Sequence, residues 1–132
     1  GGFEGVRDEG GIRATLDFVQ NDLYYPNFAD KLTYLMYRFC SGHFFNDGNK
    51  RIALTLGAYF LYKNNYYWHA CICMRTLEAV IYHVAASNID QDLLLRIVNS
   101  FMTSKDYDEE LKIDIANAMS KGELGIQGED YE

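Results

Sequence analysis

The residues best suited to chemistry lie in one short run, His43 to Arg51, with the sequence HFFNDGNKR. The run contains a titratable base, a carboxylate, a glycine, an amide and two cations. Residues 52–62, which follow directly, are mostly apolar and predict a buried helix. We therefore expect the polar run in a loop and at the N-terminus of this helix, where free backbone N–H groups and the helix dipole favour phosphate. A base beside such a helix end indicates an enzyme site for phosphoryl or nucleotidyl transfer.

His43 and Asp47 are the candidate catalytic and metal-binding residues of the run. A histidine exchanges protons near neutral pH, so His43 suits a general base, although a lone loop histidine is more often a simple surface residue. Asp47 can offer carboxylate oxygen to a Mg²⁺ ion that bridges nucleotide phosphates. The competing role for Asp47 is the N-cap of the following helix, because aspartate often occupies that position.

The next four residues provide groups that can hold a phosphate. Gly48 allows the backbone to approach an anion closely, and the amide of Asn49 can donate to a phosphate oxygen. Lys50 and Arg51 would neutralise charge on a transferred group, with Arg51 able to bind two oxygens at once. Cations in a first helical turn oppose the helix dipole, so a bound anion explains them better than solvent exposure does.

Together these residues resemble the motif of the Fic/Doc family, which reads His-x-Phe-x-(Asp/Glu)-Gly-Asn-(Gly/Lys)-Arg. The fixed positions of that motif are filled here by His43, Phe45, Asp47, Gly48, Asn49, Lys50 and Arg51. Residues 5–65 as a whole are similar to a Doc-type domain, with the motif loop flanked by helices. Phe45 is expected to anchor the loop in the core, whereas Phe44 stands where many family members have proline.

The resemblance implies a transferase that moves a phosphate-containing group from ATP to a hydroxyl side chain of a target protein. It implies that His43 accepts the proton of that hydroxyl and that Asp47 holds Mg²⁺, which favours the metal role over the cap. The residues implied to bind nucleotide phosphates are Gly48, Asn49, Lys50 and Arg51.

Lys50 separates the subclasses within this resemblance. Family adenylyltransferases typically carry glycine at this position, whereas Doc-type members carry lysine, which implies an inverted nucleotide that donates its γ-phosphate. We therefore expect Doc-like phosphoryl transfer, with protein adenylylation (AMPylation) as the alternative. A catalytically inactive protein-interaction domain is the alternative from outside the enzymes, and the intact His43 and Asp47 count against it.

Resemblance to Doc further implies a toxin of a toxin–antitoxin pair, with a target in the translation machinery. The family's inhibitory motif, Ser/Thr-x-x-x-Glu-(Gly/Asn), is not matched at Glu4-Gly5 or at Glu9-Gly10. We therefore expect the activity to be inhibited by a separate antitoxin or by a removed flanking segment.

Length and composition predict one domain over residues 1–132. A formal net charge of −7 argues against nucleic acid as a partner, and no apolar run reaches the roughly 18 residues of a membrane span. The three cysteines lack the spacing of a disulfide framework, which fits the cytoplasm. His69, Cys71 and Cys73 form only a weak metal-site pattern. Because the chain opens on Gly1 without methionine, we interpret it as processed or as excised from a longer protein.

The periodicity of the whole chain predicts an all-α bundle of about six helices, with the motif loop before a buried central helix. Ile12, Leu16 and Val19 are expected to face inward from the first helix. Residues 66–73 are expected to be extended and residues 122–132 to form a flexible acidic tail. The expected helices run from Asp8 or Glu9 through Val19, from Asn27 to Gly42, from about Asn49 to Lys63, from Met74 to Ala86, from Asp90 through Phe101, and from about Tyr107 to Met119.

Overall fold

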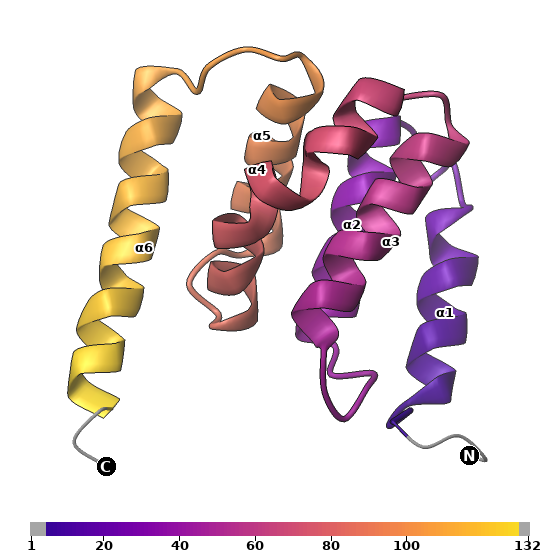
Figure 1. Ribbon diagram of the computed structural model, residues 1–132, viewed down its shortest axis with the longest axis horizontal. Coiled ribbons are helices and arrows are strands. Elements are labelled where there is room, and N and C mark those ends of the chain that lie inside the picture. Colours follow the sequence, from indigo (N-terminus) through magenta and orange to yellow (C-terminus); the bar gives the residue numbers. More distant parts are fainter. Residues whose placement is uncertain (1–4, 130–132) are drawn as a thin grey trace.

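The computed structural model of the chain describes residues 5–129, with side chains described up to residue 121. Within this part the fold is all-helical, as predicted, and the one strand-like feature is an isolated antiparallel bridge between Val6 and Phe45. Figure 1 shows α1 and α6 at the two ends of the row of helices. The helix bounds are α1 Glu9–Val19, α2 Phe28–Ser41, α3 Asn49–Lys63, α4 Tyr67–Ala85, α5 Gln91–Met102 and α6 Glu109–Glu129.

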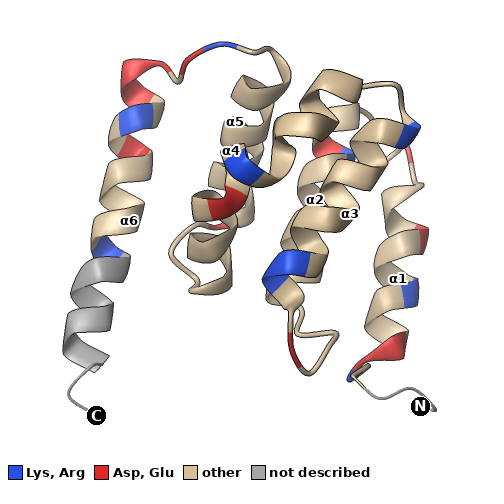
Figure 2. Cartoon of the chain, viewed as in Figure 1, with Lys and Arg blue, Asp and Glu red and all other residues tan. Residues whose placement is uncertain are grey.

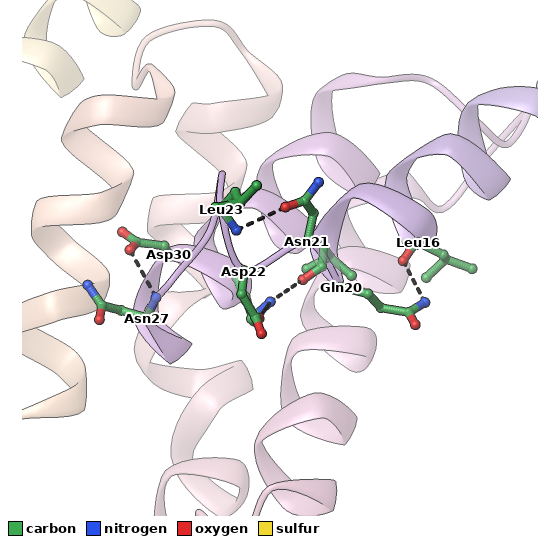
Figure 3. Close-up of polar contacts among 9 residues, drawn as sticks. Leu16, Gln20, Asn21, Asp22, Leu23, Asn27 and Asp30 are labelled. Carbon is green, nitrogen blue, oxygen red and sulfur yellow. Dashed lines mark hydrogen bonds and ion pairs between the residues drawn. The ribbon is translucent and has the colours of Figure 1, made fainter.

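Polar caps fix where three of the helices begin, at the residues that the sequence predicts. The carboxylates of Asp8 and Asp90 each accept a backbone N–H three residues further on, at 2.8 Å. Asn27 is the N-cap of α2, and its backbone N–H donates to the Asp30 carboxylate at 3.4 Å (Figure 3). Gly42 is the C-cap of α2. The predicted starts of α1, α2 and α5 are therefore confirmed.

The connection between α1 and α2 is held by short polar contacts, part of which Figure 3 shows. The side-chain oxygen of Asn21 accepts from the backbone N–H of Leu23 at 2.9 Å. The amino group of Lys31 donates to the carbonyl of Val19 at 2.7 Å and pairs with Asp22 at 2.8 Å. A cation at the C-terminus of a helix complements the helix dipole, so Lys31 stabilises the end of α1 and holds it against α2.

The hydrophobic core lies between α2, α3, α4 and α5. Leu32 and Met36 of α2 have no exposed surface, and neither do Leu61 of α3, Leu77 of α4 and Ile97 of α5. Burial of these side chains removes apolar surface from water and is the main stabilising contribution to the bundle. The two helices on either side of the motif loop, α2 and α3, are therefore fixed by a shared core.

The helix that follows the motif loop is buried on one face only. Ala53, Gly57 and Leu61 of α3 are buried, whereas Tyr59 and Tyr62 are exposed. The prediction of a buried helix thus holds for one stripe of α3, because tyrosine side chains can keep their hydroxyl ends in water.

Two local predictions were wrong. Residues 66–73 are not extended, because α4 begins at Tyr67; aromatic and β-branched residues favour strands only weakly, and burial of Cys73 at helical spacing from Leu77 overrides that preference. Leu16 of α1 is exposed, and Thr15 is buried in its place. The Thr15 hydroxyl donates to the Gly11 carbonyl at 2.8 Å, which removes the cost of burying it.

The last helix also differs from its prediction, since α6 runs to Glu129 rather than ending near Met119. The glycines after Met119 each weaken a helix by about 1 kcal/mol relative to alanine, which does not exclude one. The flexible tail predicted for residues 122–132 overlaps this helix, and residues 130–132 lie outside the described part of the chain.

Close packing of α2 against α3 at Gly57 leads to a stability prediction. A Cβ atom at Gly57 would lie 2.8 Å from the sulfur of the fully buried Met36, whereas one at Gly10 would meet nothing closer than 3.7 Å. We expect Gly57→Val to destabilise the fold by about 1–3 kcal/mol through overpacking. Gly10→Val is the matched control and should leave the unfolding free energy in urea nearly unchanged. Equal effects of the two substitutions would contradict the packing argument.

Candidate active site

The motif loop, residues 42–48, joins α2 to α3 at the end of the bundle where α1 begins (Figure 1). The segment before α1 runs antiparallel to the motif loop. The backbone N–H of Arg7 donates to the carbonyl of Phe44 at 2.7 Å, and the N–H of Asn46 donates to the carbonyl of Gly5 at 2.8 Å. These bonds tie the loop to α1 as well as to the two helices that it connects.

Phe44 is the side chain that anchors the loop, and it has no exposed surface. Its ring lies edge-on to Phe39, with the two centroids 5.2 Å apart. Gly11 and Gly42 make room for the ring, because a Cβ atom at these positions would lie 2.5 Å and 2.6 Å from a ring carbon. Phe45, the expected anchor, is only half-buried and packs at the edge of the core. The deeper anchor is therefore the neighbouring Phe44.

Asn49 closes the loop through its side-chain amide. The amide oxygen accepts from the backbone N–H of Phe45 at 3.1 Å, and the amide nitrogen donates to the carbonyl of Phe45 at 3.0 Å. The group that was expected to donate to phosphate thus holds the loop in shape. This gives Asn49 a positioning role in the structure.

Gly48, with φ of 76°, is the N-cap of α3, and it provides no side chain to cap the helix. The backbone N–H groups of the first turn therefore remain available to a ligand or to water. Asp47 is not the cap; its carboxylate accepts from the N–H of Gly48 at 2.8 Å. The left-handed conformation at this position favours glycine, which has no Cβ atom to strain it.

A cleft of about 1180 Å³ opens beside the motif loop. It brings together the predicted residues His43, Asp47, Gly48, Asn49, Lys50 and Arg51, whereas Phe45 does not line it. Its opposite side is formed by α4, through Met74, Arg75, Glu78, Ala79, Tyr82, His83 and Ala85. His43 and Lys50 are exposed, so a nucleotide and an acceptor group could reach them from solvent.

Charge in the cleft is contributed from both sides. Basic residues lie in the first turn of α3, and α4 carries a basic and an acidic residue (Figure 2). The amino group of Lys50 lies 5.8 Å from the ring centroid of Tyr82, across the cleft. Arg75 adds a third cation to Lys50 and Arg51, against the carboxylates of Asp47 and Glu78. The cleft is thus locally richer in cations than the chain as a whole.

We did not predict from the sequence that α4 forms one side of the cleft. Arg75, Glu78 and Tyr82 recur at spacings of three and four residues, which places them on one helix face. That spacing indicates a polar stripe on the helix predicted from Met74 to Ala86. The sequence did not indicate which part of the fold this stripe would face. The resemblance also ended at residue 65, so nothing in the motif pointed to α4.

Two further titratable side chains line the cleft. The ring nitrogen Nδ1 of His83 lies 3.1 Å from the amide nitrogen of Asn88, so His83 is a hydrogen-bonded residue at the rim of the cleft. Burial raises the pKa of the Cys40 thiol to about 11. The thiol is therefore protonated at neutral pH, where it can donate to the carbonyl of Ile81, 3.4 Å away.

Within the described residues, no group of three or more His, Cys, Asp or Glu side chains is arranged to hold a metal ion. Cys71 is exposed, Cys73 is buried, and His69 lies 3.2 Å from the hydroxyl of Ser104. A single exposed carboxylate such as Asp47 nevertheless suits Mg²⁺, which is commonly held by one or two carboxylates together with substrate phosphates and water. None of the described helices has the length and apolar content needed to cross a membrane.

The model of the Fic/DOC family matches residues 7–61. The match begins just before α1, contains the whole motif loop and ends within α3. The match supports a Fic/Doc-family domain over residues 7–61, as the motif predicts, and the matched part does not include α4. No curated protein and no solved structure matches the chain.

The amide of Asn49 leads to a prediction about the loop. We expect Asn49→Ala to lower the free energy of unfolding by about 1–3 kcal/mol, because it removes two side-chain bonds to the backbone of Phe45. Asn46→Ala is the matched control, since Asn46 is exposed and its backbone N–H still reaches Gly5. Urea unfolding of both variants measures the difference. Similar losses in the two variants would show that Asn49 does not hold the loop.

Proposed function

We propose that this chain is a Fic-type transferase that moves a phosphate-containing group from ATP to a hydroxyl side chain of a target protein, with Doc-like phosphoryl transfer favoured. The observation that carries the proposal is the cleft itself. It places His43 beside the uncapped N-terminus of α3 and the cations Lys50 and Arg51. A general base next to a phosphate-binding helix end is what such a transfer needs.

In the proposed reaction the acceptor hydroxyl oxygen bonds to the γ-phosphorus, and the bond from that phosphorus to the oxygen of ADP breaks. The hydroxyl proton passes to the imidazole of His43. Lys50, Arg51 and the N–H groups of the first turn of α3 bind the phosphate oxygens and neutralise their charge. Asp47 would hold Mg²⁺, which would neutralise negative charge on the nucleotide.

Adenylyl transfer is the second candidate, because the motif residues other than Lys50 fit it equally well. In that reaction the hydroxyl oxygen bonds to the α-phosphorus, and pyrophosphate leaves. Lys50 supports the first candidate, since it places a long cationic side chain where the other subclass usually has glycine. An inactive interaction domain would require neither His43 nor the cations.

The proposed biological setting follows from the likeness to Doc. We propose a cytoplasmic toxin whose target belongs to the translation machinery and whose activity is restrained by an antitoxin or a flanking segment. A protein acceptor is preferred to nucleic acid, because the net charge is −7 and, among the described residues, the cleft is lined by only three cations, Lys50, Arg51 and Arg75.

The role of His43 is tested with ATP labelled at either the γ- or the α-phosphate, incubated with the chain and a cell lysate. We expect the wild type to transfer γ-label to protein and His43→Ala to lose about 10²–10⁴-fold in rate. The same variant should keep its fold and the rise in melting temperature that Mg²⁺-ATP causes, because an exposed loop side chain contributes little to packing. Activity of His43→Ala above a tenth of the wild type would remove His43 from the mechanism.

Lys50 is tested by the position of the label. We expect the wild type to transfer only γ-label, and Lys50→Gly to lose that transfer and to gain transfer of α-label. The substitution removes both a charge and a side chain from the first turn of α3, at a cost in stability of about 1 kcal/mol. Mass spectrometry of the modified protein separates phosphate from AMP. An AMP adduct made by the wild type would promote the adenylyltransferase alternative.

A further inference from the structure

We propose that Tyr82 of α4 is a positioning residue for Lys50 and helps to set which phosphate of ATP faces His43; this inference rests on the proposed function. The two side chains come from opposite walls of the cleft. The amino group of Lys50 lies 5.8 Å from the centroid of the Tyr82 ring. The electron-rich face of an aromatic ring attracts an ammonium group at this separation.

The ammonium group of Lys50 needs such a contact in order to bind phosphate at a defined position in the cleft. Its charge is compact and sits at the end of a flexible four-carbon chain, so an exposed lysine samples many directions. Among the side chains that the structure describes, Lys50 takes part in none of the ion pairs, although Glu78 lines the same cleft. The aromatic ring is therefore what directs the ammonium group toward α4.

Tyr82 is presented by a rigid element. The residue before it, Ile81, is fully buried, and Val84 is 1% exposed, so this part of α4 is fixed in the core. Tyr82 itself is 47% exposed, and its ring lies edge-on to His83, with the centroids 5.4 Å apart. A half-exposed ring on a fixed helix can hold a mobile cation without being needed for folding.

The chain contains a matched pair away from the cleft. On α3, the amino group of Lys63 lies 5.9 Å from the ring centroid of Tyr59, which is also exposed. Neither residue lines the cleft. Tyr59→Leu therefore removes a comparable contact and leaves the proposed site intact, which makes it the control for Tyr82→Leu.

The experiment combines a spectroscopic and a catalytic measurement on the full chain. Lysine side chains are labelled with ¹³C, the signal of Lys50 is assigned by its loss in Lys50→Arg, and its ε-methylene shift is recorded by NMR. We expect an upfield ring-current shift in the wild type and in Tyr82→Phe that disappears in Tyr82→Leu. Tyr59→Leu should change the signal of Lys63 only.

On the same samples, transfer from γ- and α-labelled ATP is measured. We expect Tyr82→Leu to lose about two- to fivefold in γ-transfer and to raise the ratio of α- to γ-label, since an exposed contact of this kind has that strength. Tyr82→Phe should restore both values, and Tyr59→Leu should match the wild type. An unchanged Lys50 signal or an unchanged label ratio in Tyr82→Leu would overturn the inference alone. No transfer from either label by the wild type would remove the proposed function and this inference with it.

Discussion

The burial of Phe44 beneath the motif loop is the constraint on which the rest of the site depends. A ring without exposed surface fixes one residue of a seven-residue loop, so the neighbouring residues cannot move independently of the core. The carbonyl of the same residue accepts backbone bonds from Arg7 and Asp8, at 2.7 and 3.0 Å. Both the side chain and the main chain of Phe44 are thereby fixed. His43, directly before it, is held on the exposed side of the loop with a left-handed φ of 52°.

The electrostatics of the first turn of α3 favour an anionic ligand. Lys50 and Arg51 lie at the positive end of the helix dipole, where cations are unfavourable and anions are favoured. The N-cap is a glycine, so no capping side chain accepts from the N–H groups of the first turn. Nucleotide phosphates would accept from the free N–H groups and pair with both cations. Under the proposed function, the cations cost some helix stability in the free protein, and nucleotide binding would recover it.

Local signals allowed much of this fold to be predicted. Asp8, Asn27 and Asp90 are capping residues followed by helical periodicity, and each begins a helix where it was expected. The central helix was also bounded correctly, because a mostly apolar stretch lies between Gly48 and Asn64.

The sequence was less informative where tertiary contacts decide which residues are buried and where a helix begins. Phe45 packs at the edge of the core, and the space left by Gly11 and Gly42 makes the adjacent Phe44 the more deeply buried of the two. The extended segment was predicted from the aromatic residues around Trp68, whose local preference was overridden by packing of α4 on α3. The second wall of the cleft was not predicted either, since the position of Tyr82 beside the motif loop depends on how α4 packs.

The two walls of the cleft are fixed by different parts of the chain, and a buried hydrogen bond links α2 to α4. The loop wall is fixed by residues within the part that matches the Fic/DOC family, whereas α4 lies outside that match. The thiol of Cys40, in the last turn of α2, donates a hydrogen bond to the carbonyl of Ile81, next to Tyr82. Because burial raises the pKa of this thiol to about 11, the donor persists across the physiological pH range. The helix that ends at the motif loop thus also contacts α4, and together with the packing of α4 on α3 this makes the separation of the two walls a property of the core.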